Sequence, residues 1–172
     1  LRIHGTHNIP ASPVRVTGLH AQDDPLAVFG KKATTHFAAN GFNECNVYST
    51  RANEEIESFF GVEYAEKLKL ANPLASDQTH LRASLLPGLL EVMRLNQARG
   101  NDVRRLFEKG QVFHVLDHEV VEMVSIGFIM LQEPLQRHWK DPVVHDFFTA
   151  KQFVMEILHL AGISEGKIDF QP

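Results

Sequence analysis

The chain has 172 residues, 44% hydrophobic and 22% charged, a mixture typical of one globular domain rather than of a disordered or fibrous protein. Its 17 Lys and Arg against 21 Asp and Glu give a formal net charge of -4, which argues against a dedicated, non-specific nucleic-acid-binding protein. A single cysteine, Cys45, allows no internal disulfide and favours a reducing, cytoplasmic setting.

Residues 1–22 are predicted to form a connector from a preceding domain. They contain Gly5, Pro10, Pro13 and Gly18 and show no sustained hydrophobic period. The first residue is not an initiator Met and no signal-peptide pattern follows it, so we interpret the chain as an internal piece of a longer polypeptide. The core domain is expected over residues 23–172 and to be incomplete at its C-terminus.

An amphipathic helix is predicted from Asp23 or Asp24 to Gly41, with Pro25 in its first turn. Four apolar residues share one of its faces: Leu26, Phe29, Ala33 and Phe37. Such a stripe suits packing against the domain's own sheet or against another subunit. Periodicity alone leaves both alternatives open.

The middle of the chain alternates between short strands and helices. A strand over Phe42–Ser49 is followed by a short helix from Asn53 and by a strand over Lys67–Ala71. Ser84 is predicted to cap a longer helix that ends before Gly100. In that helix, apolar residues recur at helical spacing: Leu86, Leu89, Leu90 and Met93.

Two extended runs come next, Arg104–Lys109 and Gln111–Leu116, separated by Gly110 and followed by a turn at Asp117-His118. From Val120 to Leu131 both alternating sets of residues are largely apolar, which predicts a strand at the centre of a sheet, covered on both faces. Its uncharged part, Met123–Leu131, is far short of the roughly 20 residues of a membrane-spanning helix, so no membrane contact is expected.

A last helix carries Thr149 and Gln152 in capping-box spacing and ends at Gly162, and a short strand is predicted over Lys167–Phe170. Strands joined mainly by hairpins, with helices between them, predict an α+β domain in which helices flank an antiparallel β-sheet.

Two groups of histidines and acids are candidate metal or acid–base sites: His114, Asp117, His118 and Glu119, and His138, Asp141, His145 and Asp146. Imidazole and carboxylate groups are natural zinc or iron ligands. However, His114 and His118 straddle the predicted turn instead of sharing one helical face, which favours turn and surface roles. A free-standing metal-dependent hydrolase therefore remains only an alternative.

Other chemistry finds little support in the sequence. Cys45 lies in a predicted strand, away from the helix N-terminus that activates nucleophilic thiols, and neither phosphate-binding glycine motif is present. Between residues 91 and 109, basic residues outnumber the three acids Glu91, Asp102 and Glu108. The basic residues are Arg94, Arg99, Arg104, Arg105 and Lys109. This basic group could touch a phosphate backbone such as that of tRNA, but a solvated face is favoured. We assign no catalytic, cofactor-binding or metal-binding residue.

Three blocks in order, Leu70–Leu74, Leu81–Leu90 and Leu106–Phe113, together resemble the beta chain of bacterial phenylalanyl-tRNA synthetase. Arg2–Pro10 and Asp146–Phe148 extend the resemblance to both ends of the chain. It implies a class II synthetase catalytic-like module that is a degenerate, non-catalytic copy of the alpha chain's catalytic domain. Such a module acts in assembling an enzyme of two alpha and two beta chains. The implied partners are the alpha subunit and, through the holoenzyme, tRNA, and the holoenzyme uses ATP and magnesium.

The resemblance also assigns meaning to two sets of residues. The alpha-chain pattern Gly-Arg-Val-Tyr-Arg-Arg-Asp aligns with Gly110–Leu116, so His114 stands where an arginine would meet the ATP α-phosphate. An imidazole lacks that permanently charged fork, which implies that the module is inactive alone. The third class II block, which carries another ATP arginine, is not found before Pro172.

The first helix occupies the place of a subunit-packing block, which makes Leu26, Phe29, Ala33 and Phe37 candidate interface residues. On this basis, we expect Phe29→Asp and Phe37→Asp to weaken assembly more than folding. A stand-alone, synthetase-like metabolite-binding protein is a further alternative.

Overall fold

The computed structural model describes residues 2–12, 23–132, 146–164 and 166. Within the predicted connector, the described part holds one short 3-10 turn, η1, at Thr6–Asn8. Residues 13–22 lie outside the described residues, so the boundary between connector and core domain stays a prediction.

Helix α1 spans Pro25–Ala39 and begins and ends as predicted. The carboxylate of Asp24 accepts a hydrogen bond from the backbone N–H of Leu26 at 3.1 Å, and Pro25 occupies the first helical position. Gly41 follows the helix with φ at 77°, a backbone conformation that side chains with a Cβ disfavour. The chain then turns directly into the first strand.

Two helices follow one another at α2, Asn53–Phe60, and α3, Val62–Leu68, with Gly61 between them. The predicted strand over Lys67–Ala71 is therefore wrong. Ala65 and Leu68, three residues apart, are buried on one face of α3 against Ile56 and Ala83. Only Lys69 makes a single antiparallel bridge, with His80.

The main sheet of the described residues has the strand order β1-β4-β5, formed by Asn43–Glu44, Arg105–Leu116 and Glu119–Met130. Strands β4 and β5 form an antiparallel hairpin in unbroken register from Arg105↔Met130 to Leu116↔Glu119. Asp117 and His118 make its turn, with φ of 48° and 69°, the left-handed pair that tight hairpins prefer. The short strand β1 pairs parallel to β4, and a second sheet joins β2, Thr50–Arg51, to β3, His80–Leu81.

The α+β prediction with an antiparallel sheet is confirmed, but two details of it are wrong. Gly110 does not separate two strands, because β4 runs through it without a break. The strand after the turn is not central either. Among the described strands β4 occupies the centre and β5 an edge, and Val120, Met123 and Val124 on β5 are exposed.

Helix α4 spans Leu86–Ala98 and helix α5 spans Phe147–Leu160. The hydroxyl of Ser84 accepts from the N–H of Leu86 at 3.2 Å, close to the predicted cap. Helix α5 begins earlier than predicted, because Asp146 forms the capping box with Thr149. The strand predicted over Lys167–Phe170 lies outside the described residues.

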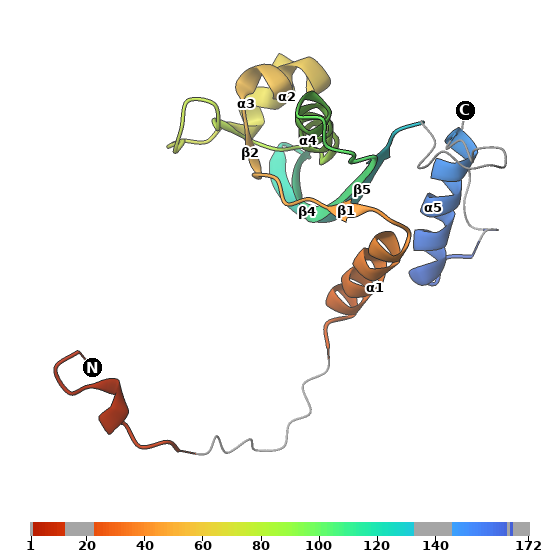
Figure 1. Cartoon of the computed structure of the whole chain (residues 1–172). Coiled ribbons are helices and arrows are strands. Elements are labelled where there is room, and N and C mark those ends of the chain that lie inside the picture. The colour runs from red at the N-terminus through yellow and green to blue at the C-terminus, as the bar shows by residue number, and fades with distance from the viewer. Residues whose placement is uncertain (1, 13–22, 133–145, 165, 167–172) are drawn as a thin grey trace.

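Helices cover both faces of the sheet (Figure 1): α2, α3 and α4 lie on one side, and α1 and α5 lie side by side on the other. On the α4 side, buried residues pack in one cluster: Leu85, Leu89, Met93, Leu106 and Val112. On the α1 side the core is aromatic: Phe37, Phe42, Phe107 and Phe153. In the part of the chain that the structure describes, no helix is long and apolar enough to cross a membrane.

Candidate functional site

The face of the sheet on the α4 side carries His114, the residue that the sequence singled out. A cavity of about 620 Å³ lies over this face. Its walls come from four places: the end of α2 at Phe59 and Phe60, residues 83–87 at the start of α4, Val112 and His114 of β4, and residues 125–128 of β5. The fold therefore brings His114 to a concave site built from segments far apart in the sequence.

The imidazole of His114 is held by Tyr64 from α3. The Tyr64 hydroxyl lies 3.3 Å from Nδ1 of His114 and accepts a hydrogen bond from the backbone N–H of Val115 at 3.1 Å. A hydroxyl that accepts from an N–H keeps its own proton to donate. This contact turns Nδ1 of His114 toward Tyr64 and fixes the orientation of the imidazole ring.

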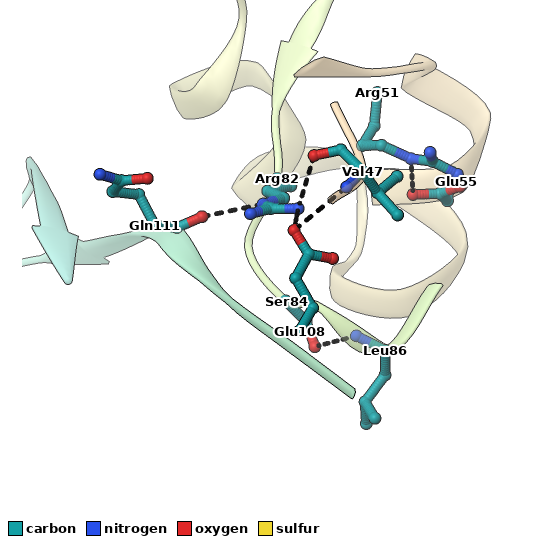
Figure 2. Close-up of polar contacts among 8 residues, drawn as sticks. All are labelled: Val47, Arg51, Glu55, Arg82, Ser84, Leu86, Glu108 and Gln111. Carbon is teal, nitrogen blue, oxygen red and sulfur yellow. Dashed lines mark hydrogen bonds and ion pairs between the residues drawn. The ribbon is translucent and has the colours of Figure 1, made fainter. Parts of the chain in front are cut away.

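A buried ion pair lies in the interior of the domain (Figure 2). Nη1 of Arg82 donates to Oε1 of Glu108 at 2.7 Å and to the carbonyl oxygen of Val47 at 3.1 Å, and Nε donates to the carbonyl oxygen of Gln111 at 2.8 Å. The Glu108 carboxylate also accepts the N–H of Val47 at 3.3 Å. One guanidinium thus ties β4 to the segment after β1 and to the segment after β3.

Gly110 makes room for this guanidinium. A Cβ added at residue 110 would clash with Nη2 of Arg82. Gly110 therefore serves close packing and not a break between strands.

The Arg82–Glu108 pair has a structural role. Only 6% of the Arg82 side chain and 1% of the Glu108 side chain are exposed, so neither group reaches a substrate. Removing one partner from such a buried pair leaves an uncompensated charge in a low-dielectric interior. The pair therefore holds β4 against the segments around Val47 and Arg82.

The four predicted interface residues on α1 divide into two pairs. Ala33 and Phe37 are 0% and 1% exposed and belong to the chain's own core, so they have no surface left for a partner. The expectation that Phe37→Asp spares folding is therefore wrong. Leu26 is 54% exposed and Phe29 is partly exposed, and for these two the interface assignment stays a prediction.

The histidine–acid groups do not come together where the structure describes them. Within those residues no three His, Cys, Asp or Glu side chains are placed to hold a metal ion. Asp146 caps α5, and its pKa is lowered chiefly by the hydrogen bond from the backbone N–H of Thr149. His138, Asp141 and His145 lie outside the described residues.

The basic group is partly engaged in structural contacts. Arg105 is buried, donates to the carbonyl oxygen of Asn40 at 2.6 Å and lies over the ring of Phe42. Nε of Arg104 donates to Asp102 at 2.5 Å. Arg105 is therefore not placed to touch a phosphate backbone.

Cys45 is a partly buried thiol beside β4. Its backbone N–H donates to the carbonyl oxygen of Phe107 at 2.7 Å. Burial raises the pKa of the thiol, and the negative charges of Glu108 and Glu44 add to this effect. A raised pKa keeps the thiol protonated, which opposes nucleophilic chemistry.

Sequence reasoning missed Tyr64, Arg82 and Glu108. Glu108 carried a usable signal, because it directly follows Leu106 and Phe107 inside a predicted strand, where a carboxylate needs a partner. The sequence did not show that Arg82 is this partner, because Arg82 is 26 residues away from Glu108.

Comparisons with known proteins give a consistent picture. A family described as "Phenylalanyl tRNA synthetase beta chain CLM domain" matches residues 9–172. The phenylalanine–tRNA ligase beta subunit of Bradyrhizobium diazoefficiens is 32% identical over 168 residues, which cover 94% of this chain and 21% of that protein. The beta subunit of Zymomonas mobilis is 30% identical over 175 residues, 98% of this chain and 21% of that protein. The chain thus spans about a fifth of the length of these relatives.

Among solved structures, the pyrrolysyl-tRNA synthetase PylSc of Desulfitobacterium hafniense is similar with a TM-score of 0.61 and 18% sequence identity. The match covers 82% of this chain and 46% of that one. At this identity the likeness shows the fold alone, and this chain shares the fold of that synthetase over most of its length.

Proposed function

The chain belongs to the CLM-domain family of phenylalanyl-tRNA synthetase beta chains, and we propose that it is a structural, catalytically degenerate module of such a subunit. In this proposal it supports assembly of an enzyme of two alpha and two beta chains that attaches phenylalanine to its tRNA using ATP. The alpha subunit is its direct partner, and tRNA is met through the holoenzyme. We also propose a cytoplasmic location, which the lone cysteine supports.

The observation that carries this proposal is the chemistry of the cavity around His114. Among the residues that the structure describes, those that line the cavity include no Lys, Arg, Asp or Glu. Arg82 is buried and engaged by Glu108, Val47 and Gln111.

These residues do not fit ATP and magnesium. A polyphosphate needs permanent cations or a metal held by carboxylates, and an imidazole is neither. We therefore assign ATP and magnesium in the holoenzyme to the alpha subunit, and no step of the reaction to this chain.

Exposed apolar residues on the α1 side support a role in assembly. Leu26 and Val28 of α1 and Leu160 at the end of α5 are exposed and border one shallow hollow, together with Phe29. Apolar clusters of this kind on a protein surface mark interaction sites. This surface lies across the sheet from the cavity over His114, because α1 covers the opposite face.

The test is ATP–pyrophosphate exchange with phenylalanine. We expect no exchange from the 172-residue chain and full exchange when a complete beta chain that contains this module is mixed with the alpha chain. Exchange by the 172-residue chain alone would refute the assignment of His114 to a degenerate position.

Metal analysis of the same preparation addresses the alternative of a metal-dependent hydrolase. Stoichiometric zinc or iron that is lost in a His114→Ala, His118→Ala double variant would support the hydrolase against the structural module. The second alternative, a stand-alone synthetase-like metabolite-binding protein, is favoured if the alpha chain fails to bind a complete beta chain carrying this module.

A further inference from the structure

The proposed structural role does not use the cavity of about 620 Å³ that lies over His114. We propose that this cavity binds a neutral aromatic or apolar small molecule that carries a carbonyl group or a similar polar group and forms a hydrogen bond with His114. This inference does not depend on the proposed function, because it rests on the walls and polar groups of the cavity alone.

The walls of the cavity are apolar and partly aromatic. Phe59 and Phe60 close one side, and Leu86 and Pro87 border another. The volume of about 620 Å³ lies within the range of about 300–1,000 Å³ in which proteins bind small molecules. The ring of Phe60 stacks on Tyr64 at 5.4 Å, so the residue that holds His114 also supports the wall.

Three polar groups converge on this apolar volume. His114 lines the cavity and has its Nε2 edge free for a ligand, because its Nδ1 faces the Tyr64 hydroxyl. Ser84 accepts from the N–H of Leu86 through its oxygen, which leaves its own hydroxyl proton to donate. The hydroxyl of Ser125 lies on the same face of β5, directly across from Gly110. The two hydroxyl groups can each donate a hydrogen bond, which fits a ligand with a carbonyl group or a similar acceptor.

The charge of the lining selects the class of ligand. A nucleotide, or a free amino acid with its ammonium and carboxylate groups, would find no Lys, Arg, Asp or Glu among the lining residues that the structure describes. Burying an unpaired ion is costly, whereas an aromatic ring loses only its contact with water. Neutral ligands are therefore favoured over ionic ones.

Acetanilide is a suitable probe, since it joins one aromatic ring to one amide carbonyl. Its binding to the ¹⁵N-labelled chain can be followed by NMR titration, with ATP as the ionic comparison. We expect saturable shifts of the amides of residues 125–128 and of the His114 ring with acetanilide, and none with ATP. A titration without saturable shifts in these residues would overturn the proposal.

Variants localise the binding. Phe60→Ala removes an aromatic ring from the wall of the cavity, and we expect it to weaken acetanilide binding at least threefold. Because the Phe60 side chain is 37% exposed, the substitution should not disturb the core. Phe147→Ala is the matched control, because Phe147 is 73% exposed on α5, outside the cavity, and its loss should leave the affinity unchanged. Phe59→Ala provides a second wall variant if the spectrum of Phe60→Ala shows loss of the fold. Equal affinities in the wall variants and the control would contradict the proposed site.

Discussion

Nη1 of Arg82 donates to Oε1 of Glu108 at 2.7 Å in the interior of the domain (Figure 2). The same guanidinium reaches the backbone carbonyl groups of Val47 and Gln111. Three chain segments that are distant in sequence therefore meet at one cation. Because β4 contributes both Glu108 and Gln111, the pair fixes the position of β4 relative to the loops that line the cavity.

Glu108→Ala is expected to destabilise the fold by about 3–5 kcal/mol, because it leaves Arg82 charged and unpaired in the interior. The free energy of unfolding in urea measures this loss. Glu91→Ala is the control, since Glu91 pairs with Arg51 at 2.6 Å but its side chain is 52% exposed, and its removal should cost about 1 kcal/mol or less. A double variant, Arg82→Met with Glu108→Leu, should recover part of the loss, because it removes both buried charges but leaves the carbonyl groups of Val47 and Gln111 without their donor. A Glu108→Ala protein as stable as Glu91→Ala would show that the buried pair contributes little.

Gly110→Ala is expected to lower the melting temperature, since the new Cβ meets Nη2 of Arg82, and the guanidinium cannot move without breaking its bonds. Gly30→Ala is the control, because its new Cβ would also lie close to a side chain, 3.0 Å from Nζ of Lys109. Nζ is the end of a flexible, exposed side chain, so Lys109 can move away. Alanine also favours a helix over glycine by up to about 1 kcal/mol, so Gly30→Ala should be neutral or stabilising. Thermal melts followed by circular dichroism distinguish the two. If both variants melt alike, Gly110 has no special packing role.

The contrast between these glycines shows what the sequence could and could not predict. Helix α1, helix α4 and the Asp117-His118 hairpin were predictable, because caps, helical periodicity and turn residues act within a few positions. The sequence led us to predict a break between strands at Gly110. The glycine is needed there because the side chain of Arg82 packs against it, and no local pattern reveals that contact. The position of His114 in a concave site was equally invisible until β4, β5 and α4 were placed together.

The α2–α3 region shows a second limit. Helix α3 is only seven residues long, and two of its residues, Ala65 and Leu68, carry its burial. So short a segment has no sustained period, and its helical state is decided by packing on Ile56 and Ala83. The apolar sequence of β5 predicted a central strand that is buried on both faces. Among the described strands, β5 instead lies at an edge of the sheet.

The α1 residues give a prediction that separates folding from assembly. Leu26→Asp adds a carboxylate at an exposed position in the first helical turn, where negative charge is tolerated, so the fold should persist. Binding of the alpha subunit by a complete beta chain carrying Leu26→Asp should weaken at least tenfold, which corresponds to about 1.4 kcal/mol. Phe37→Asp should instead unfold the module, since Phe37 stacks on Phe107 at 5.0 Å inside the aromatic core. Circular dichroism measures folding, and analytical ultracentrifugation measures binding of the alpha subunit. If Leu26→Asp assembles as the wild type does, the exposed surface around Leu26 is not part of the interface.

The pH dependence of Cys45 provides the last prediction. Burial, then Glu108 and Glu44, raise the pKa of its thiol, so the folded state holds the thiol proton more tightly than the unfolded state does. The resulting contribution to stability is present below the unfolded pKa and is lost as pH rises through the folded pKa. Alkylation by iodoacetamide, which needs the thiolate, should therefore rise at a higher pH in the folded chain than in the urea-unfolded chain. Glu44→Gln removes one exposed negative charge and should shift the alkylation profile to lower pH, because less repulsion opposes the thiolate. A folded chain whose profile coincides with that of the unfolded chain would show that the surroundings of Cys45 do not hold its proton.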